Sequence, residues 1–188
     1  MSSKGRKAGD PLDRYDTPPK PVRRFLAAWV PIAYAHRRRP ANVWEPAAGA
    51  GNFLAPLRER FPKAHIKASD IEPRCTAAGE IDFLDCHISG YDLIITNPPF
   101  RLAEQFVRHG LKLVEPKGYV VMYLRAGFEQ AKCRNNFFEE FMPYQTWTCR
   151  ERPQFTGPAA KKGTDSAFYK WFVWRKGYHP EYTEQRWV

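Results

Sequence analysis

The sequence predicts an α/β fold in which helices cover both faces of a mostly parallel, seven-stranded sheet. Short runs rich in β-branched residues alternate along the chain with segments whose apolar residues recur at helical spacing, which is the pattern of strand–helix–strand units. The last two strand-like runs have no helical segment between them. We therefore expect them to form an antiparallel hairpin at the end of the sheet.

The expected strands follow the β-branched and aromatic runs, at residues 42–45, 65–69, 81–84, 91–96, 118–124, 145–150 and 167–174. The expected helices follow the helical periodicity, at residues 20–29, 52–60, 101–114 and 128–141. Thr17-Pro18-Pro19 signals the start of the first helix, and Pro31 is expected to end or kink it. Asn52 is a suitable N-cap for the second helix. Pro98-Pro99 stops the fourth strand.

The chain is expected to form a single domain over residues 13–188, behind a mobile basic tail at residues 1–12. Aromatic residues make up 15% of the sequence, which excludes disorder for most of it. There is no apolar run long enough for a membrane span and no secretory signal. The cysteines show no metal-binding spacing, so we expect reduced thiols, no metal site and a cytoplasmic location. They are Cys75, Cys86, Cys133 and Cys149.

Positive charge gathers at the two flanks of the chain, whose formal net charge is +10. Residues 1–40 carry ten basic and three acidic residues, residues 125–188 carry eleven and seven, and residues 41–124 have a net charge of −1. If the flanks meet in space, they form a positive surface that suits a polyanion, most simply nucleic acid. A basic surface that serves only solubility is the alternative.

A glycine-containing turn, Glu45 to Gly51 (EPAAGAG), follows the first strand and precedes a helix. Glycine lets the backbone turn sharply and lets a ligand approach it closely, near the N-terminus of the helix. Asp70 ends the next strand, where an acidic side chain meets ribose hydroxyls. The third glycine of a dinucleotide fingerprint is absent, so a nucleoside cofactor without phosphates fits better than NAD. The alternative is a tight turn without a ligand.

The four residues Asn97-Pro98-Pro99-Phe100 directly follow the fourth strand. The two prolines stiffen the backbone at the sheet edge that binds ligands. The Asn97 amide oxygen and the Pro98 carbonyl are both acceptors and suit an –NH2 group, while Phe100 offers a flat face beside it. This arrangement fits an amino group on a planar heterocycle, whose nitrogen becomes nucleophilic when its protons are held. The alternative is a proline pair that only terminates the strand.

In these motifs and in their order, the sequence resembles S-adenosylmethionine-dependent DNA adenine-N6 methyltransferases of the gamma motif order, and most of all the small phage-type ones. Tyr15-Asp16-Thr17-Pro18 resembles the N-terminal cofactor motif, and Glu45 to Gly51 the main cofactor loop. Asp70-Ile71 resembles the ribose-binding acid, Asp82-Phe83 the adenine-binding motif, and Asn97 to Phe100 the catalytic motif. The likeness covers about residues 13–125.

The resemblance implies a Rossmann-like class I methyltransferase fold with S-adenosyl-L-methionine as its cofactor. The cofactor-binding residues that we expect are Tyr15, Thr17, Pro18, Glu45, Pro46, Ala47, Gly49, Gly51, Asn52, Phe53, Asp70, Ile71, Asp82 and Phe83. The catalytic residues that we expect are Asn97, Pro98, Pro99 and Phe100. The residues expected to contact nucleic acid are Arg125, which follows the fifth strand, and Lys161 and Lys162, in a loop near the open edge.

One departure from the family concerns target recognition. Sequence-specific enzymes of this kind carry a separate target-recognition domain, whereas only 88 residues (188 − 100) follow Phe100. The sequence therefore predicts methylation of adenine N6 in DNA with low sequence specificity, and a chain without that extra domain. Two alternatives stay open: an RNA methyltransferase acting on adenine N6 or guanine N2, and a non-catalytic nucleic-acid-binding protein that keeps the fold.

Overall fold

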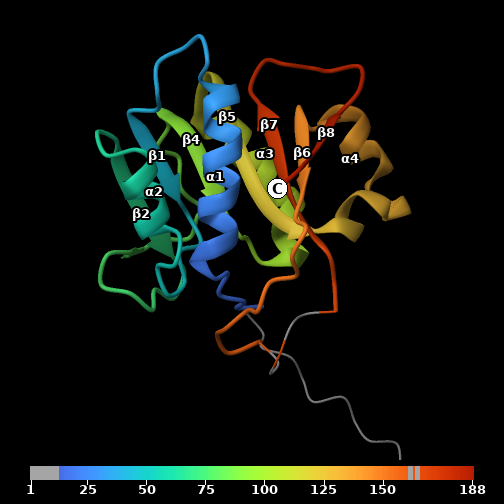
Figure 1. The fold of residues 1–188 in the computed structure, drawn as a ribbon. Helices are drawn as coiled ribbons and strands as arrows, with labels where there is room; N and C mark the ends of the chain where they lie inside the picture. The colour runs from blue at the N-terminus through green and yellow to red at the C-terminus, as the bar shows by residue number, and fades with distance from the viewer. Residues whose placement is uncertain (1–12, 161–162, 164–165) are drawn as a thin grey trace, which may run out of the picture.

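A mixed eight-stranded sheet forms the centre of the molecule (Figure 1). The computed structural model describes residues 13–160, 163 and 166–188. The strands are β1 (Asn42–Glu45), β2 (His65–Asp70), β3 (Gly79–Glu80), β4 (Tyr91–Thr96), β5 (Val114–Arg125), β6 (Gln145–Thr148), β7 (Tyr169–Arg175) and β8 (Glu184–Trp187). Their order is β3-β2-β1-β4-β5-β7-β6-β8. Strands β1 to β5 are parallel, β7 lies antiparallel between β5 and β6, and β8 is parallel to β6.

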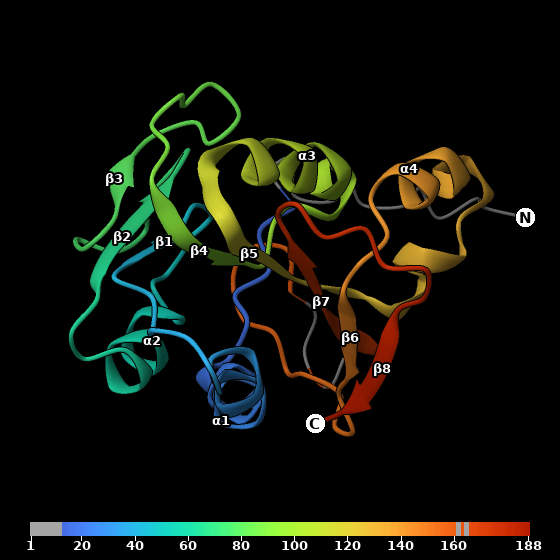
Figure 2. The ribbon, with the colours of Figure 1, turned by 90° about the horizontal axis from the view of Figure 1, so that it is seen from above.

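Helices cover both faces of this sheet (Figure 2). The four α-helices are α1 (Pro19–Ala33), α2 (Leu54–Arg60), α3 (Ala103–Leu113) and α4 (Asn135–Glu140). Three short 3-10 helices join them: η1 (Phe100–Leu102), η2 (Ala126–Gln130) and η3 (Lys132–Arg134). Figure 2 shows α1 and α2 on one face and α3 and α4 on the other. The predicted α/β class, with its mostly parallel sheet and antiparallel hairpin, is confirmed.

Aromatic side chains hold α1 against the sheet. The buried Phe25 ring stacks on Trp171 of β7 at a centroid distance of 4.4 Å and on Trp29 at 5.3 Å. Trp29 meets Tyr119 of β5 edge to face at 5.2 Å. Such burial stabilises by roughly 25 cal/mol per Å² of apolar area. Pro31 lies inside α1 and does not end it, because the helix continues to Ala33 although proline has no amide hydrogen to donate to the preceding turn.

The opposite face is built around α3. Phe106 packs on Phe83 at a centroid distance of 4.7 Å, and Phe83 meets Trp44 of β1 at 5.1 Å. A Cβ added at Gly110 would lie 3.2 Å from a methyl group of Val120 on β5, so glycine lets α3 pack closely on the sheet. Both layers fix the strands whose ends form the site.

Two strand predictions need correction. Residues 81–84 are not a strand, because the Asp82 carboxylate accepts the Leu84 amide at 2.9 Å and closes a local turn. The third strand is instead the short β3, two residues earlier. Strand β8 was not predicted and makes the sheet eight-stranded rather than seven-stranded. Its residues Glu184–Trp187 are mostly polar, so they carry no apolar strand pattern.

Two helix predictions also need correction. Asn52 is not an N-cap, because the turn after β1 continues through a hydrogen bond from the Leu54 amide to the Gly51 carbonyl at 3.0 Å, and α2 begins only at Leu54. Residues 128–141 do not form one helix. The extended backbone of Ala131 (ψ 115°) divides the segment into η2, η3 and α4.

Candidate active site

A cavity opens at the carboxyl ends of β1, β2 and β4, which is the edge where open α/β sheets bind ligands. The predicted site residues that line it are Tyr15, Pro46, Ala47, Gly49, Asp70, Ile71, Asp82, Phe83, Asn97 and Pro99. The lining residues that we did not predict are Asp13, Arg14, Asp16, Arg74, Ile81, Leu84, Arg101, Leu102 and Phe106. The structure thus brings the cofactor motifs and the Asn97 motif to one place.

The turn after β1 requires glycine. Gly49 and Gly51 have positive φ values of 49° and 81°, which side chains rarely adopt. A Cβ added at Gly49 would lie 2.8 Å from an Asp16 carboxylate oxygen. The Gly49 amide donates to the Asp70 carboxylate at 2.7 Å, which ties the turn to the end of β2. The absence of a side chain at Gly49 therefore leaves room for the Asp16 and Arg74 side chains beside the turn.

Asp70 is half-buried beside this turn. One carboxylate oxygen accepts the Gly49 amide, and the other accepts the Glu72 amide at 2.9 Å. Each carboxylate oxygen has two lone pairs, so both oxygens keep the capacity to accept a further donor. Ile71, the next residue, lines the cavity and is 49% exposed. The pair therefore offers acceptors and an apolar surface side by side, which suits a ribose and the base attached to it.

Glu45 is buried behind the turn and does not line the cavity. One of its oxygens accepts the Ala47 amide at 3.1 Å, and the other has no hydrogen-bond partner among the described residues. Burial raises the pKa of Glu45 to about 8, although the hydrogen bond from the Ala47 amide favours the ionised form. Glu45 therefore stabilises the turn as a neutral carboxyl, through the hydrogen bond that it accepts from the Ala47 amide.

Asn97 is oriented by a residue far away in the sequence. Its side-chain amide nitrogen donates to the Tyr15 carbonyl at 2.9 Å. Its side-chain oxygen is buried and has no hydrogen-bond partner in the described part of the chain. A buried acceptor left without a donor costs about 1–3 kcal/mol. This cost is recovered when a ligand amino group donates to the oxygen.

Phe100 lies within a group of aromatic rings. Its amide donates to the Asp13 carboxylate at 2.9 Å. Its ring lies 5.6 Å from the Tyr15 ring and 6.0 Å from the Tyr169 ring, between centroids. The Arg125 guanidinium lies 4.8 Å from the Phe100 centroid, and its Nε donates to the Tyr169 hydroxyl at 3.3 Å. Arg125 is therefore held beside the ring of the Asn97 motif.

Two ion pairs that we did not predict connect the segment before α1 to the loop after β2. The buried Asp16 carboxylate pairs with both terminal nitrogens of Arg74, one of them at 2.7 Å. Arg14 pairs with Glu72 at 2.7 Å. Asp16 is part of the predicted N-terminal motif, but neither Arg74 nor the pairing has a local sequence signal.

Some predicted cofactor residues lie elsewhere. Phe53 is buried in the core against Trp171, with 5.8 Å between centroids, and Phe83, although it borders the cavity, is only 2% exposed. Pro18 lines a different cavity. The remaining predicted site residues outside the lining are Thr17, Glu45, Gly51, Asn52, Pro98, Phe100 and Arg125. Lys161 and Lys162 lie outside the described residues.

The described residues contain no group of three or more His, Cys, Asp and Glu side chains placed to hold a metal ion. The four cysteines are free. Within the same part of the chain, none of the helices has the length and apolar character needed to cross a membrane.

No protein-family model matches the chain, and no curated protein matches it. Solved structures do resemble it. A protein from Listeria monocytogenes, provisionally described as a class I S-adenosylmethionine-dependent methyltransferase, matches with a TM-score of 0.68 and 14% identity over 98% of this chain and 69% of its own. The N-methyltransferase NodS from Bradyrhizobium japonicum was solved with S-adenosyl-L-homocysteine. It matches with a TM-score of 0.53 and 13% identity over 87% of this chain and 90% of its own.

A third similar structure is the type IIG restriction endonuclease BpuSI. It matches with a TM-score of 0.62 and 15% identity over 93% of this chain and 26% of its own. At these identities the likeness establishes the fold. The chain has the Rossmann-like methyltransferase fold that its motif order predicts.

Proposed function

We propose that this protein transfers a methyl group from S-adenosyl-L-methionine to the exocyclic N6 amino group of adenine in DNA, with low sequence specificity. The observation that carries the proposal is the buried side-chain oxygen of Asn97, a cavity-lining residue, which has no donor among the described residues. The amino group of a planar base supplies the donor that this oxygen lacks.

The residues around the cavity fit the proposed cofactor. Asp70 keeps acceptor capacity for ribose hydroxyls, and exposed Ile71 offers apolar contact to the cofactor's adenine, with Asp82 nearby. Gly49 also lines the cavity, on the turn that ties β1 to Asp70. NodS, which shares the fold, was solved with the demethylated form of this cofactor. When bound, S-adenosyl-L-methionine would supply an electrophilic methyl group on its sulfonium sulfur.

The chain's own part in the reaction is to hold the target amine. The Asn97 oxygen accepts a hydrogen bond from one N–H of the amino group. We assign the hydrogen bond from the second N–H to the Pro98 carbonyl. Holding both protons localises the nitrogen lone pair, so the amine becomes nucleophilic without a strong base. Phe100 stacks on the base and fixes its plane. Positioning of the amine supplies most of the rate.

Nucleic acid is the substrate class that the charge supports best. The net charge of +10 suits a polyanion, and a base must leave its stack to reach a cavity of this kind. BpuSI, a restriction endonuclease, shares the fold, which is compatible with a nucleic-acid substrate, and we propose DNA as the polymer. Arg125, beside Phe100, is positioned to contact the strand next to the target base. We retain Lys161 and Lys162 as further proposed contacts.

The proposal is tested by incubating the protein with methyl-labelled cofactor and duplex DNA, single-stranded DNA or RNA, followed by mass spectrometry of the nucleosides. We expect N6-methyladenine in DNA. Asn97→Ala removes one of two acceptors for the amine, so turnover should fall at least about a hundredfold while cofactor affinity changes little. Label confined to RNA or to guanine would contradict the substrate. Wild-type turnover in Asn97→Ala would contradict the mechanism.

A further inference from the structure

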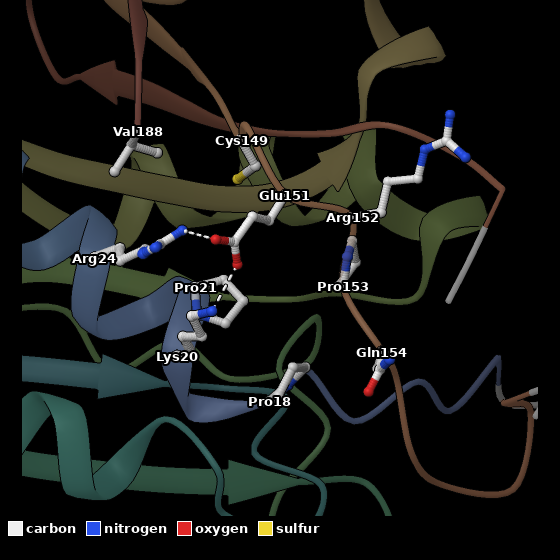
Figure 3. A pocket seen from close by; sticks show the side chains of 10 residues that line it. All are labelled: Pro18, Lys20, Pro21, Arg24, Cys149, Glu151, Arg152, Pro153, Gln154 and Val188. Atoms are coloured by element: carbon white, nitrogen blue, oxygen red, sulfur yellow. Dashed lines mark hydrogen bonds and ion pairs between the residues drawn. The ribbon is translucent and has the colours of Figure 1, made fainter. Parts of the chain in front are cut away.

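A second cavity lies between the start of α1 and the segment that follows β6. Three cationic side chains and one carboxylate line it (Figure 3). Lys20 and Arg24 come from the first two turns of α1, and Glu151 and Arg152 come from the opposite segment. We call it the basic groove. The cations outnumber the carboxylate, so an anion entering the groove meets a net positive lining.

Glu151 occupies the centre of the basic groove. Its two carboxylate oxygens pair with Lys20 and Arg24, each at 2.7 Å, as Figure 3 shows. These pairs hold the pKa of Glu151 below its ordinary value, Lys20 more strongly than Arg24. All three side chains are about half exposed. Ion pairs with this exposure contribute little to stability because water screens them, so another anion can replace the carboxylate at small cost.

The groove and the active-site cavity have no lining residue in common, but the segment before α1 contributes residues to both. Residues 13–16 line the active-site cavity, and the same stretch of chain continues through Pro18 into the basic groove. On the other side, Asp16 and Thr156 exchange two backbone hydrogen bonds, of 2.9 and 3.1 Å, and residues 151–154 continue from there into the groove. In Figure 1 the two segments lie beside each other below the sheet. A strand with a base at Asn97 therefore has a basic surface next to it.

We propose that the basic groove binds a backbone phosphate of the nucleic-acid strand whose base enters the Asn97 site, and that Glu151 holds Lys20 and Arg24 in place until the phosphate replaces it. This rests on the proposed function, because it takes the same polymer as its ligand. A phosphate diester carries one negative charge and accepts from both cations, as the carboxylate does. The groove thus contributes affinity without reading sequence, in keeping with low specificity.

Glu151→Gln provides the decisive test because it should strengthen binding. Removing the competing carboxylate should raise the affinity for a fluorescein-labelled single-stranded DNA of 12 nucleotides about three- to tenfold, measured by anisotropy. The dependence of log K on log salt should also steepen, because Lys20 and Arg24 are then no longer neutralised within the protein by Glu151. A gain in affinity does not arise from misfolding, so the result stays interpretable if stability changes.

A matched control exists on the other side of α1. Glu59 forms a bidentate pair with Arg23, with both hydrogen bonds at 2.8 Å and both side chains about half exposed, and neither residue lines the groove. Glu59→Gln makes the same change in net charge as Glu151→Gln and should leave affinity within about twofold. Likewise Arg24→Ala should weaken binding several-fold more than Arg23→Ala.

The outcomes separate this proposal from the proposed function. Equal effects of Glu151→Gln and Glu59→Gln, in a protein that methylates DNA, would overturn the groove and leave the function standing. Tighter binding by Glu151→Gln alone, in a protein that binds the strand but methylates no nucleic acid, would support the groove and overturn the function. If inorganic phosphate binds as tightly as the strand and Glu151→Gln improves only phosphate binding, the groove is an anion site unrelated to nucleic acid, and the proposal fails.

Discussion

At the scale of single residues, two buried oxygens without donors mark the site, and they have different roles. The Asn97 oxygen lies at the cavity edge, whereas the unpaired Glu45 oxygen lies behind the turn that lines the cavity. For Asn97 the missing donor is one that a substrate can supply. Glu45 instead avoids a buried charge by staying protonated, because burial raises its pKa to about 8. The oxygen without a donor thus suits ligand binding at Asn97 and belongs to the structure of the turn at Glu45.

The titration of Glu45 leads to a prediction about stability. Its pKa is about 8 in the folded state against an ordinary value of 4.5, so the folded protein binds the proton more tightly than the unfolded chain. The stability that this proton contributes is complete below about pH 4.5 and is lost as pH rises toward 8. Glu45→Gln keeps a neutral group, so near pH 8.5 its free energy of unfolding should exceed that of the wild type by about 2–4 kcal/mol.

Urea denaturation of both proteins between pH 5 and pH 9 measures this difference. The difference should shrink toward zero at low pH, and Glu80→Gln, an exposed control on β3, should follow the wild type throughout. Parallel curves for Glu45→Gln and the wild type would show that Glu45 ionises normally in the folded protein.

At the scale of secondary-structure elements, the cavity lies between two segments that carry complementary charges. Residues 13–16, before α1, present Arg14 and Asp16, and residues 72–74, after β2, present Glu72 and Arg74. Arg14, Asp16 and Arg74 line the cavity, whereas Glu72 does not. Backbone hydrogen bonds also hold both segments, between Asp16 and Thr156 and from the Arg74 amide to the Gly49 carbonyl. We expect the width of the cavity to depend on the two ion pairs as well.

Charge reversal tests this dependence. Arg14→Glu alone and Glu72→Arg alone should each weaken binding of S-adenosyl-L-methionine by about three- to tenfold, which corresponds to roughly 0.7–1.4 kcal/mol. The double swap should restore most of the affinity, because the pair is rebuilt with reversed polarity. Calorimetry gives the affinities, and the matched swap of Arg23 and Glu59 should have no effect. Equal affinity in all variants would show that the segments do not close on the cofactor.

At the scale of the whole molecule, the sheet brings distant basic segments to one end. The carboxyl ends of the parallel strands form the cavity, and the start of α1 and the segment after β6 add the basic groove beside it. The start of α1 belongs to the basic N-terminal flank, and the segment after β6 belongs to the basic C-terminal flank. These two parts of the flanks meet, which is the condition on which the polyanion interpretation depends.

Binding of nucleic acid should therefore fall steeply with salt. For a single strand, log K should decrease against log salt with a slope of about −0.7 for each phosphate contacted. Anisotropy titrations between 50 and 200 mM salt, with DNA and RNA of the same sequence, measure the slope for each polymer. An affinity that does not change over this range would show that the net charge of +10 does not serve a polyanion.

The sequence by itself determined the features that depend on neighbouring residues. The turn at Gly49 and Gly51, the stiff Asn97–Phe100 segment and the ends of β1 and β4 follow from local backbone preferences and from β-branched runs, which act over a few residues. Because parallel strands align their carboxyl ends, the order of the motifs also placed Asp70 and Asn97 at one edge. The periodicities therefore sufficed for the fold class.

Only the tertiary structure decided what holds these residues in position. The Tyr15 carbonyl that orients Asn97 is 82 residues away in sequence, Asp16 and Arg74 are 58 apart, and Lys20 and Glu151 are 131 apart. No local preference encodes such contacts, because they form only when helices and strands pack together. Strand β8 has the same origin: its polar residues pair with β6 because an open sheet edge is available there. Local backbone preferences thus determined where the motif residues lie along the strands and turns. Packing determined which distant residues orient their side chains.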